Sequence, residues 1–281
     1  MNFAISMIAA AFYSVSSALL SRALSAQTAV GQGADAGTDN QRKNAEIAAA
    51  RRRLFLIMAA AAVFLHGLVI INQTGLPHGL KLPLFTSIAA TSLTIALLHI
   101  VLCLKQPADY LGIAVYPLAA ISLIASHASG GGTEIVGQAV QIHVFLSLVA
   151  YAVLALAATQ AILVSIQRHF LSHHKPGGFI RSLPPLDATE HLLFTLLATG
   201  FILLSLSLAS GFFYLEDMFT QRLVHKTVLS CVGWTVFGVL LFGRWQFGWR
   251  GKKAVHWTLA GFAILVLAYF GSKLVIEILL R

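Results

Sequence analysis

Charged residues are scarce in this sequence. Asp, Glu, Lys and Arg make up only 10% of its 281 residues, against roughly 25% in an ordinary soluble domain. Hydrophobic residues make up 58%, and the mean hydropathy is +0.81. Because so few polar side chains cannot cover a water-soluble fold of this size, the composition excludes a soluble globular domain and indicates a membrane protein.

Acidic residues are scarcer than basic ones: the sequence has 10 Asp and Glu and 19 Lys and Arg, so its formal net charge is +9. A basic balance can indicate nucleic-acid binding, but such proteins gather their Lys and Arg in one patch or stripe. Here the basic residues lie between long apolar runs, which is typical of a membrane protein with cationic loops on one side. We therefore expect a lipid bilayer, and no nucleic acid, as a partner.

Cysteine is nearly absent. Cys103 and Cys231 each stand alone in an apolar segment, which excludes a CxxC site and predicts two small core side chains. The sequence also lacks a P-loop, a dinucleotide fingerprint, an HExxH motif and a nucleophile placed beside a base. We therefore expect no catalysis by the chain itself.

Long apolar runs are what the sequence has in abundance. A signal peptide would carry basic residues before its apolar stretch, and the first run has none. We therefore interpret this run as a retained helix. A spanning helix needs about 20 mostly apolar residues, and the runs near that length are residues 2–20, 54–72, 84–104, 110–127, 142–167, 192–215, 224–243 and 256–280. The predicted fold class is all-α, a polytopic membrane bundle of about eight transmembrane helices, of which the fourth, with Pro117 inside it, is the shortest.

The distribution of Lys and Arg predicts the orientation, because cationic loops stay on the cytoplasmic side. The opposite side holds only Lys81, Arg222, Lys226 and Arg281, while Lys273 lies in the last helix. The first, third, fifth and seventh loops hold fourteen: Arg22, Arg42, Lys43, Arg51, Arg52, Arg53, Lys105, Arg168, Lys175, Arg181, Arg244, Arg250, Lys252 and Lys253. Both termini should therefore lie outside, which in a bacterium is the periplasmic side.

The first of these basic loops runs from Ser21 to Arg53. It is rich in Ala, Gly, Gln and Asn and ends in three consecutive Arg residues. This composition predicts a flexible linker followed by an anchor at the membrane surface. Residues 1–53 are thus expected to form a first helix plus a flexible basic cytoplasmic loop.

Four histidines, His66, His127, His143 and His225, fall in the outer half of four different predicted helices. An ionisable side chain in the hydrocarbon layer costs roughly 2.5 to 3.5 kcal/mol, so each histidine asks for a reason. Neutral imidazole is a good axial ligand for haem iron, and a flat macrocycle fits between apolar helices. The alternative is that histidines near helix ends simply lie among the polar headgroups.

Other ionisable groups have simpler interpretations. His99 and His256 lie toward the cytoplasmic ends of their helices, where we expect both to meet water. Lys273 and Glu277 are four residues apart on one face of the last helix, so they can neutralise each other. A proton or ion relay through this pair is the alternative, because transporters do place carboxylates in spanning helices.

The C-terminal half of the sequence contains several short motifs, which lie within or beside the predicted spanning helices. They are Ile142–Val144 (IHV), Leu208–Phe213 (LASGFF), His225–Thr227 (HKT), Gly248–Lys252 (GWRGK) and Ala268–Gly271 (AYFG). Over roughly residues 85–280 they resemble the cytochrome c assembly protein family, which has CcsA, CcmC and HemX types, and most of all its small inner-membrane YpjD-type subgroup. The resemblance implies that residues 54–281 form a haem-handling helical domain in a bacterial inner membrane, and that His143 is an external haem ligand.

One family segment is missing from this sequence. Haem-handling members carry a Trp-rich segment, WGxxWxWD, between the helices that correspond to the sixth and seventh runs, whereas residues 214–224 contain no Trp. His225 follows this segment at the start of the next helix and is therefore the candidate for a second ligand of the haem iron. His66 and His127 are the additional candidates on the outer face.

Three functions follow from these observations. The first is a haem-binding membrane protein that assists cytochrome c biogenesis or haem delivery, with haem as cofactor and other maturation proteins as partners. The second is an accessory subunit that uses the same scaffold without haem to bind another membrane protein. The third is a small-solute or proton-coupled transporter, which the lack of visible inverted repeats disfavours.

Overall fold

The computed structural model describes residues 2–30, 38–75, 82–128, 138–173, 182–214 and 221–271. Within these ranges the chain is almost entirely helical and has no strand, and eight helices are long and apolar enough to cross a membrane. The all-α membrane bundle predicted from the apolar runs is confirmed. The fourth span covers residues 109–128. Its central α-helix contains Pro117, and a short 3₁₀ turn extends this helix at each end.

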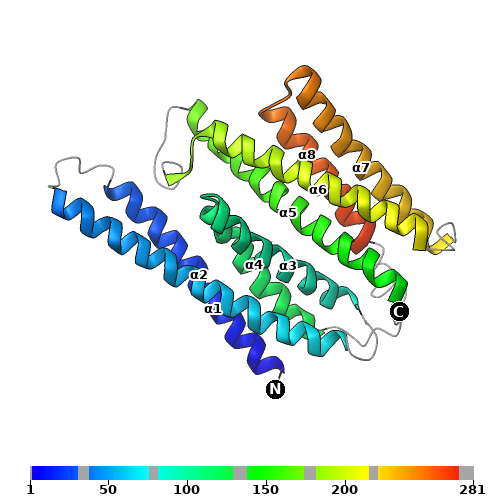
Figure 1. Ribbon diagram of the computed structural model, residues 1–281, viewed down its shortest axis with the longest axis horizontal. Helices are drawn as coiled ribbons and strands as arrows, with labels where there is room; N and C mark the ends of the chain where they lie inside the picture. Colours follow the sequence, from blue (N-terminus) through cyan, green and yellow to red (C-terminus); the bar gives the residue numbers. More distant parts are fainter. Residues whose placement is uncertain are drawn as a thin grey trace.

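The helices follow one another along the chain with short connections (Figure 1). The longer ones are α1 (Asn2–Val30), α2 (Thr38–Thr74), α3 (Leu84–Lys105), α4 (Gly112–Ala125), α5 (Gln138–Ser172), α6 (Leu186–Tyr214), α7 (Gln221–Phe247) and α8 (Lys252–Val266). Three single turns complete them: η2 (Asp109–Leu111) and η3 (Ser126–Ala128) are 3₁₀ helices, and η5 (Leu267–Gly271) is a π-helical turn that continues α8.

The eight spans form two units of four helices. In the N-terminal unit α1 packs against α2 and α4, and in the C-terminal unit α5 packs against α6 and α8. The units meet mainly where α3 lies against α5 (Figure 1). Because the number of spans is even, α1 begins and η5 ends at the same end of the bundle. Which side of the membrane that end faces stays a prediction.

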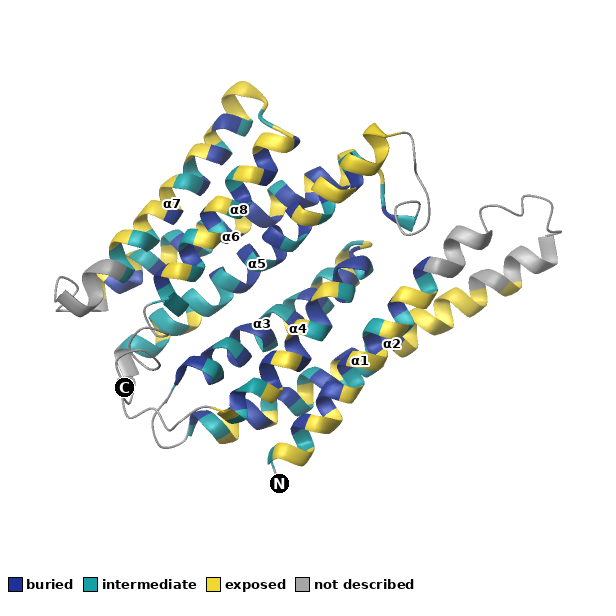
Figure 2. Ribbon diagram, turned by 180° about the vertical axis from the view of Figure 1, so that it is seen from behind, coloured by how far each residue is buried: buried dark blue, intermediate teal, exposed yellow. Residues whose placement is uncertain are grey.

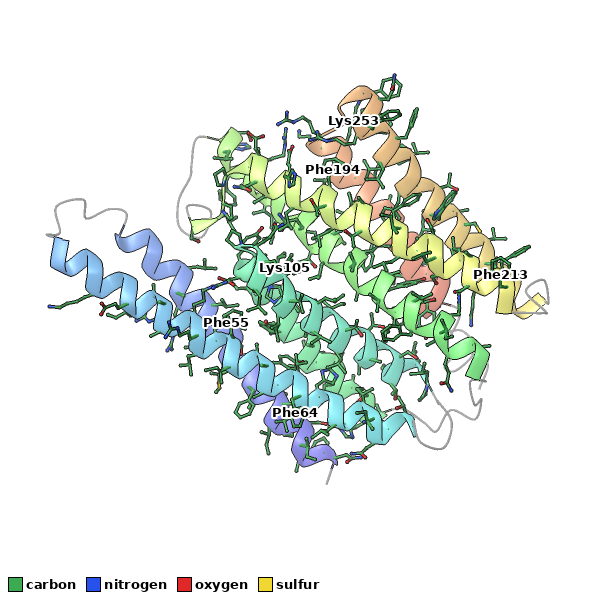
Figure 3. All side chains as sticks on the ribbon, in the orientation of Figure 1. Phe55, Phe64, Lys105, Phe194, Phe213 and Lys253 are labelled. Atoms are coloured by element: carbon green, nitrogen blue, oxygen red, sulfur yellow. The ribbon has the colours of Figure 1, made fainter. Side chains whose placement is uncertain are left out.

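The surface of the bundle is apolar rather than polar. Figure 2 shows exposed residues along the outward faces of the helices and buried ones where the helices meet. Phe64, Leu104 and Ile202 are all at least 60% exposed, and the side chain of Phe64 projects away from α2 (Figure 3). An apolar surface of this kind would be unstable in water but is suited to the hydrocarbon layer of a membrane. The backbone groups need no water there, because each helix satisfies its own hydrogen bonds.

Small residues set the spacing between the helices. Fully buried alanines such as Ala59, Ala89, Ala157 and Ala161 line the contacts. Side chains of this size let helix backbones approach closely, which is how spanning helices gain van der Waals contact where the hydrophobic effect is weak.

The first basic loop differs from its prediction. α1 continues to Val30 and α2 begins at Thr38, so helix replaces the expected flexible linker over these residues, and α2 runs without a break through the expected division between residues 53 and 54. The Ala-rich composition favours helix, and residues 31–37 lie outside the described ranges. Arg52, near the end of this basic segment, forms an ion pair with Asp109 at 2.8 Å and donates to the Cys103 carbonyl at 2.7 Å.

The turn between α7 and α8 contains the GWRGK motif. Gly248 and Gly251 have positive φ angles of 64° and 65°, which other residues adopt with strain. The Trp249 ring packs against Gly243, where an added Cβ would lie only 2.4 Å from a ring atom. The Arg168 guanidinium covers Gly251 in the same way, at 2.7 Å. The motif is thus a compact turn that docks on the end of α5.

The two cysteines, His99 and His256 test four smaller predictions. Cys103 is buried, as expected, but Cys231 is exposed on α7, so its interpretation as a core side chain is wrong. A thiol is apolar enough to face lipid, and sequence alone does not reveal which face of a helix that is apolar all round turns inward. His99 was expected to meet water and is instead fully buried, with one ring nitrogen on the Tyr116 hydroxyl. His256 is exposed, as predicted.

Candidate functional site

A cavity of about 270 Å³ lies between the two units, at the end of the bundle where α5 begins. α3 closes one side of it, and α6, α7 and η5 close the other. Its walls are mostly apolar, with hydroxyl groups and one cation among them. The polar lining side chains are Ser87, Thr91, His143, Ser147, Tyr151, Ser207, Lys226, Thr227, Ser230 and Tyr269.

His143 is the only histidine that lines this cavity among the residues described. Its Nδ1 lies 2.9 Å from the carbonyl oxygen of Ser207. Because a carbonyl can only accept, Nδ1 carries the proton and donates it, and Nε2 keeps its lone pair. The hydroxyl of Ser147 lies 3.4 Å from Nε2, so that contact is long. A backbone carbonyl on the other ring nitrogen is the arrangement that orients metal-binding histidines.

Serine hydroxyls from two helices support this arrangement. Ser147 donates to the His143 carbonyl at 2.7 Å and lies 2.6 Å from the Ser207 hydroxyl. Ser210, one turn further along α6, donates to the same Ser207 carbonyl at 2.7 Å and lies 3.1 Å from Nδ1. These hydrogen bonds join the first turns of α5 to the end of α6 and fix the direction in which the imidazole points.

Gly211 makes room for the imidazole ring. A Cβ at this position would lie 2.9 Å from Cε1 and 3.2 Å from Nδ1 of His143. The Cε1–Nδ1 side of the ring therefore lies close to the bare backbone of α6, and any larger residue would displace it. This gives a physical reason for the glycine of the LASGFF motif.

Tyrosines close the cavity on the side of α8. Tyr151 donates to the carbonyl of Leu265 at 2.9 Å, one residue before α8 ends at Val266. The chain then widens into the π-helical turn η5, which brings Tyr269 into the wall with its ring 5.9 Å from that of Tyr151. Such π-turns are uncommon and occur often at functional sites.

The other predicted histidines do not join His143 in this cavity. His66 is fully buried beside Tyr13 of α1, whose hydroxyl lies 3.2 Å from its Nδ1. His127 lies in η3, where its Nε2 is 2.8 Å from the hydroxyl of Ser6. Both therefore contact α1 in the N-terminal unit.

His225 belongs to α7, one residue before Lys226, which lines the cavity. The side chain of His225 itself lies outside what the structure describes, as do Lys273 and Glu277. Among the described side chains, no group of three or more His, Cys, Asp or Glu residues could hold a metal ion. Of the described residues in the cavity wall, His143 is the one that offers an imidazole nitrogen.

Sequence reasoning found His143 but missed the residues that hold it. Ser147 lies four residues after His143, and Ser210 three after Ser207, so pairs of polar residues at helical spacing were visible in both spans. Gly211 belongs to the LASGFF motif, but the sequence alone indicated no role for it. What the sequence could not supply is the register that places Ser207 opposite His143.

Comparison with known proteins decides the family. The model of the cytochrome c assembly protein family matches residues 81–280, well over half of the chain. The chain belongs to the cytochrome c assembly protein family. The match begins just before α3 and covers every helix that lines the cavity, so the resemblance predicted from the motifs is confirmed.

Individual members of the family match in part. Inner membrane protein YpjD of Escherichia coli (strain K12) is 39% identical over 138 residues, which are 49% of this chain and 52% of that protein. Protein HemX of Bacillus subtilis (strain 168) is 25% identical over 141 residues, 49% of this chain and 50% of its own. Cytochrome c biogenesis protein CcsA of Prochlorococcus marinus (strain NATL1A) is 26% identical over 102 residues, 34% of this chain and 32% of its own.

The chain therefore spans about half the length, or less, of the curated relatives it matches. No solved structure matches it. The match to an inner membrane protein, together with eight apolar spans, confirms the prediction that this family member is a multi-pass protein of the bacterial inner membrane.

Proposed function

We propose that the chain is a haem-binding membrane protein that assists cytochrome c biogenesis or haem delivery, and that His143 is a ligand of the haem iron. The observation that carries the proposal is the tautomer of His143. Its Nδ1–H is held by the Ser207 carbonyl, so the Nε2 lone pair is available to a metal at the cavity.

The residues present fit a porphyrin in chemistry. The wall combines apolar side chains for the macrocycle, among them Val144, Leu148, Leu204 and Leu208, with one cation, Lys226, that suits a carboxylate. The volume of about 270 Å³ is just below the roughly 300–1,000 Å³ of pockets that enclose most of a small ligand. We therefore expect the cavity to cover part of a porphyrin and the rest to extend toward the connection between α6 and α7.

Haem would supply the redox chemistry, and the side chains of this protein would bind and orient it. The proposal includes no catalytic step by the chain itself. His225, next to Lys226 in sequence, is the candidate for a second iron ligand. The name of the relative CcsA, a cytochrome c biogenesis protein, supports the role and points to other maturation proteins as partners.

The test is the absorption spectrum of protein purified from haem-replete cells, with and without reductant. We expect a Soret band that is lost or strongly weakened in His143→Ala. His127→Ala is the matched control, because that ring contacts Ser6 rather than the cavity, and its spectrum should be unchanged. Protein that carries no haem, or a Soret band that survives in His143→Ala, would contradict the proposal.

The same measurement separates the accessory-subunit alternative, which is motivated by the absence of Trp from residues 214–224. On that hypothesis the protein purifies without haem and with a stable membrane partner. His143→Ala and His225→Ala would then leave the complex intact.

A further inference from the structure

The interior of the N-terminal unit contains a line of polar side chains that the haem site does not use. Hydrogen-bonded pairs join its helices at successive levels from one end of the unit to the other. They are Ser6 with His127, Gln73 with Ser126, Ser92 with Ser122, Tyr13 with His66, Tyr116 with His99, and Arg52 with Asp109.

Three of the pairs use one face of α2. Gln73, His66 and Arg52 are separated by seven and fourteen residues, which are two and four helical turns. Tyr13 and Ser16 lie three residues apart on one face of α1, and both are fully buried. The line therefore runs along the helix axes rather than across them.

Two histidine–tyrosine pairs occupy the middle of this line. The Tyr13 hydroxyl lies 3.2 Å from Nδ1 of His66, and the Tyr116 hydroxyl lies 2.9 Å from Nδ1 of His99. The rings of the two tyrosines are stacked, with centroids 5.7 Å apart. Nε2 of His99 lies 3.1 Å from the Ala108 carbonyl, so Nε2 is the protonated nitrogen and Nδ1 accepts from Tyr116.

Three buried atoms of this interior have no hydrogen-bond partner among the described residues: Nε2 of His66, the hydroxyl oxygen of Ser16, and Oε1 of Gln73. Leaving one such group unpaired costs about 1–3 kcal/mol, and more in hydrocarbon. Polar contacts that served only to join helices would not need the additional unpaired atoms. A role that uses these atoms explains them better, because buried unpaired polar atoms are where small hydrogen-bonding molecules such as water bind.

We propose that the N-terminal unit is a proton path, with His66 as its central relay group and Tyr13, Ser16, Tyr116 and His99 as the links toward the Arg52–Asp109 pair. This function does not depend on haem at His143. It lies inside the N-terminal unit and uses none of the residues that line the cavity between the two units.

The transfer conserves protons at each step. A proton that arrives at Nε2 of His66 releases the Nδ1 proton to the Tyr13 oxygen, and Tyr13 passes on its own hydroxyl proton. No direct hydrogen bond joins the two stacked tyrosines, so the proposed transfer between them uses a water molecule, for which the unpaired hydroxyl of Ser16 on α1 is the candidate partner. Tyr116 then donates to Nδ1 of His99, Nε2 of His99 releases its proton to the Cys103 sulfur, 3.4 Å away, and the thiol gives up its own proton to the carboxylate of Asp109. Each group returns to its neutral form, and one proton has moved.

The exit lies beside the membrane edge. Beyond Tyr116, the ring of His99 contacts the sulfur of Cys103, 3.4 Å from Nε2, and Asp109, next in sequence to Ala108, forms the ion pair with Arg52. The side chain of Asp109 is 24% exposed and that of Arg52 is 47% exposed, so water reaches both. Asp109 is thus the group that would hand the proton to the aqueous phase.

The experiment measures proton uptake into vesicles that contain the full-length protein and a trapped pH-sensitive dye, driven by a potassium diffusion potential. We expect uptake above that of protein-free vesicles. Tyr13→Phe removes one hydroxyl and keeps the ring, and uptake should fall at least roughly tenfold, since about 1.4 kcal/mol of barrier corresponds to a factor of ten. His66→Phe should have the same effect.

Tyr110→Phe is the matched control. Tyr110 is also buried in this unit, but its hydroxyl donates to Gln160 of α5 rather than to the line, so uptake should be unchanged. Wild-type uptake no faster than that of protein-free vesicles would overturn the proposal. So would unchanged uptake in Tyr13→Phe, or an equal loss in Tyr110→Phe. A His143→Ala variant with normal uptake and no Soret band would separate this function from the haem site.

Discussion

His143 shows how neighbouring residues determine what one side chain can do. An imidazole at the end of a spanning helix is commonplace, since it can lie among polar headgroups. Here the Ser207 carbonyl selects the tautomer, and the bare backbone of Gly211 supports the ring. The ring that keeps a free lone pair on Nε2 belongs to a residue of the cavity wall, and the residues around it fix that tautomer.

Substitution of Gly211 tests this arrangement at the residue scale. In Gly211→Ala the new methyl group would lie 2.9 Å from Cε1 of His143, closer than real Cβ contacts, so the ring must turn and its bond to Ser207 must weaken. We expect weaker haem retention and a shifted Soret band in the purified variant. Gly67→Ala is the control, because a Cβ there meets nothing within 4 Å. Equal spectra for both variants would contradict the packing.

Among the described residues, one buried carboxylate forms ion pairs near the ends of several helices. At the start of α6, Glu190 is only 4% exposed and bridges two arginines, with Oε1 3.0 Å from Arg168 and Oε2 3.4 Å from Arg250. One arginine ends the spanning part of α5, and the other belongs to the turn before α8. This carboxylate therefore ties three elements together at the end of the bundle away from the cavity.

Loss of the Glu190 charge is the prediction at the scale of the element. Glu190→Gln leaves two guanidinium groups around a neutral amide, and we expect a loss of about 1–3 kcal/mol, less than for a fully buried pair because both arginines are partly exposed. Thermal unfolding in detergent measures it. Asp187→Asn provides the comparison, since Asp187 is 86% exposed and its bond to Arg250 should contribute little. Similar shifts in both variants would refute the bridging role.

Charge also divides the whole molecule into two ends. Figure 3 places Lys105 and Lys253 toward one end of the bundle and Phe213 toward the other. This separation matches the loop-by-loop count of basic residues, which predicts that the Lys-bearing end is cytoplasmic and that both termini are outside. The cavity proposed to bind haem would then open near the periplasmic surface.

Cysteine labelling of intact cells tests this orientation. In a background with Cys103→Ala and Cys231→Ser, a single cysteine at Asn2 should react with a membrane-impermeant maleimide. A cysteine at Lys105 should react only after the membrane is permeabilised. The reverse pattern would invert the whole topology and place His143 on the cytoplasmic side.

Much of the fold was predictable from the sequence, because a spanning helix can be recognised from its run of apolar residues alone. Apolar runs gave the eight spans, and the motifs gave the family and His143. Inward and outward faces were not predictable, as Cys231 and His99 show, since helices that are apolar all round carry no periodic signal. His66 and His127 lie apart from His143 because α1 packs against α2 and α4. The sequence showed that these histidines lie at a similar depth in the membrane, but not which helices pack together.

The length of α2 has a practical consequence for imaging. Its 37 residues extend about 55 Å, whereas the hydrocarbon layer is about 30 Å thick, so α1 and α2 project as a rod beyond the basic end (Figure 1). A 30.1 kDa bundle inside a detergent micelle offers little contrast for particle alignment. A rigid marker protein fused in helical register with this rod would stand clear of the micelle and leave every wall of the cavity untouched.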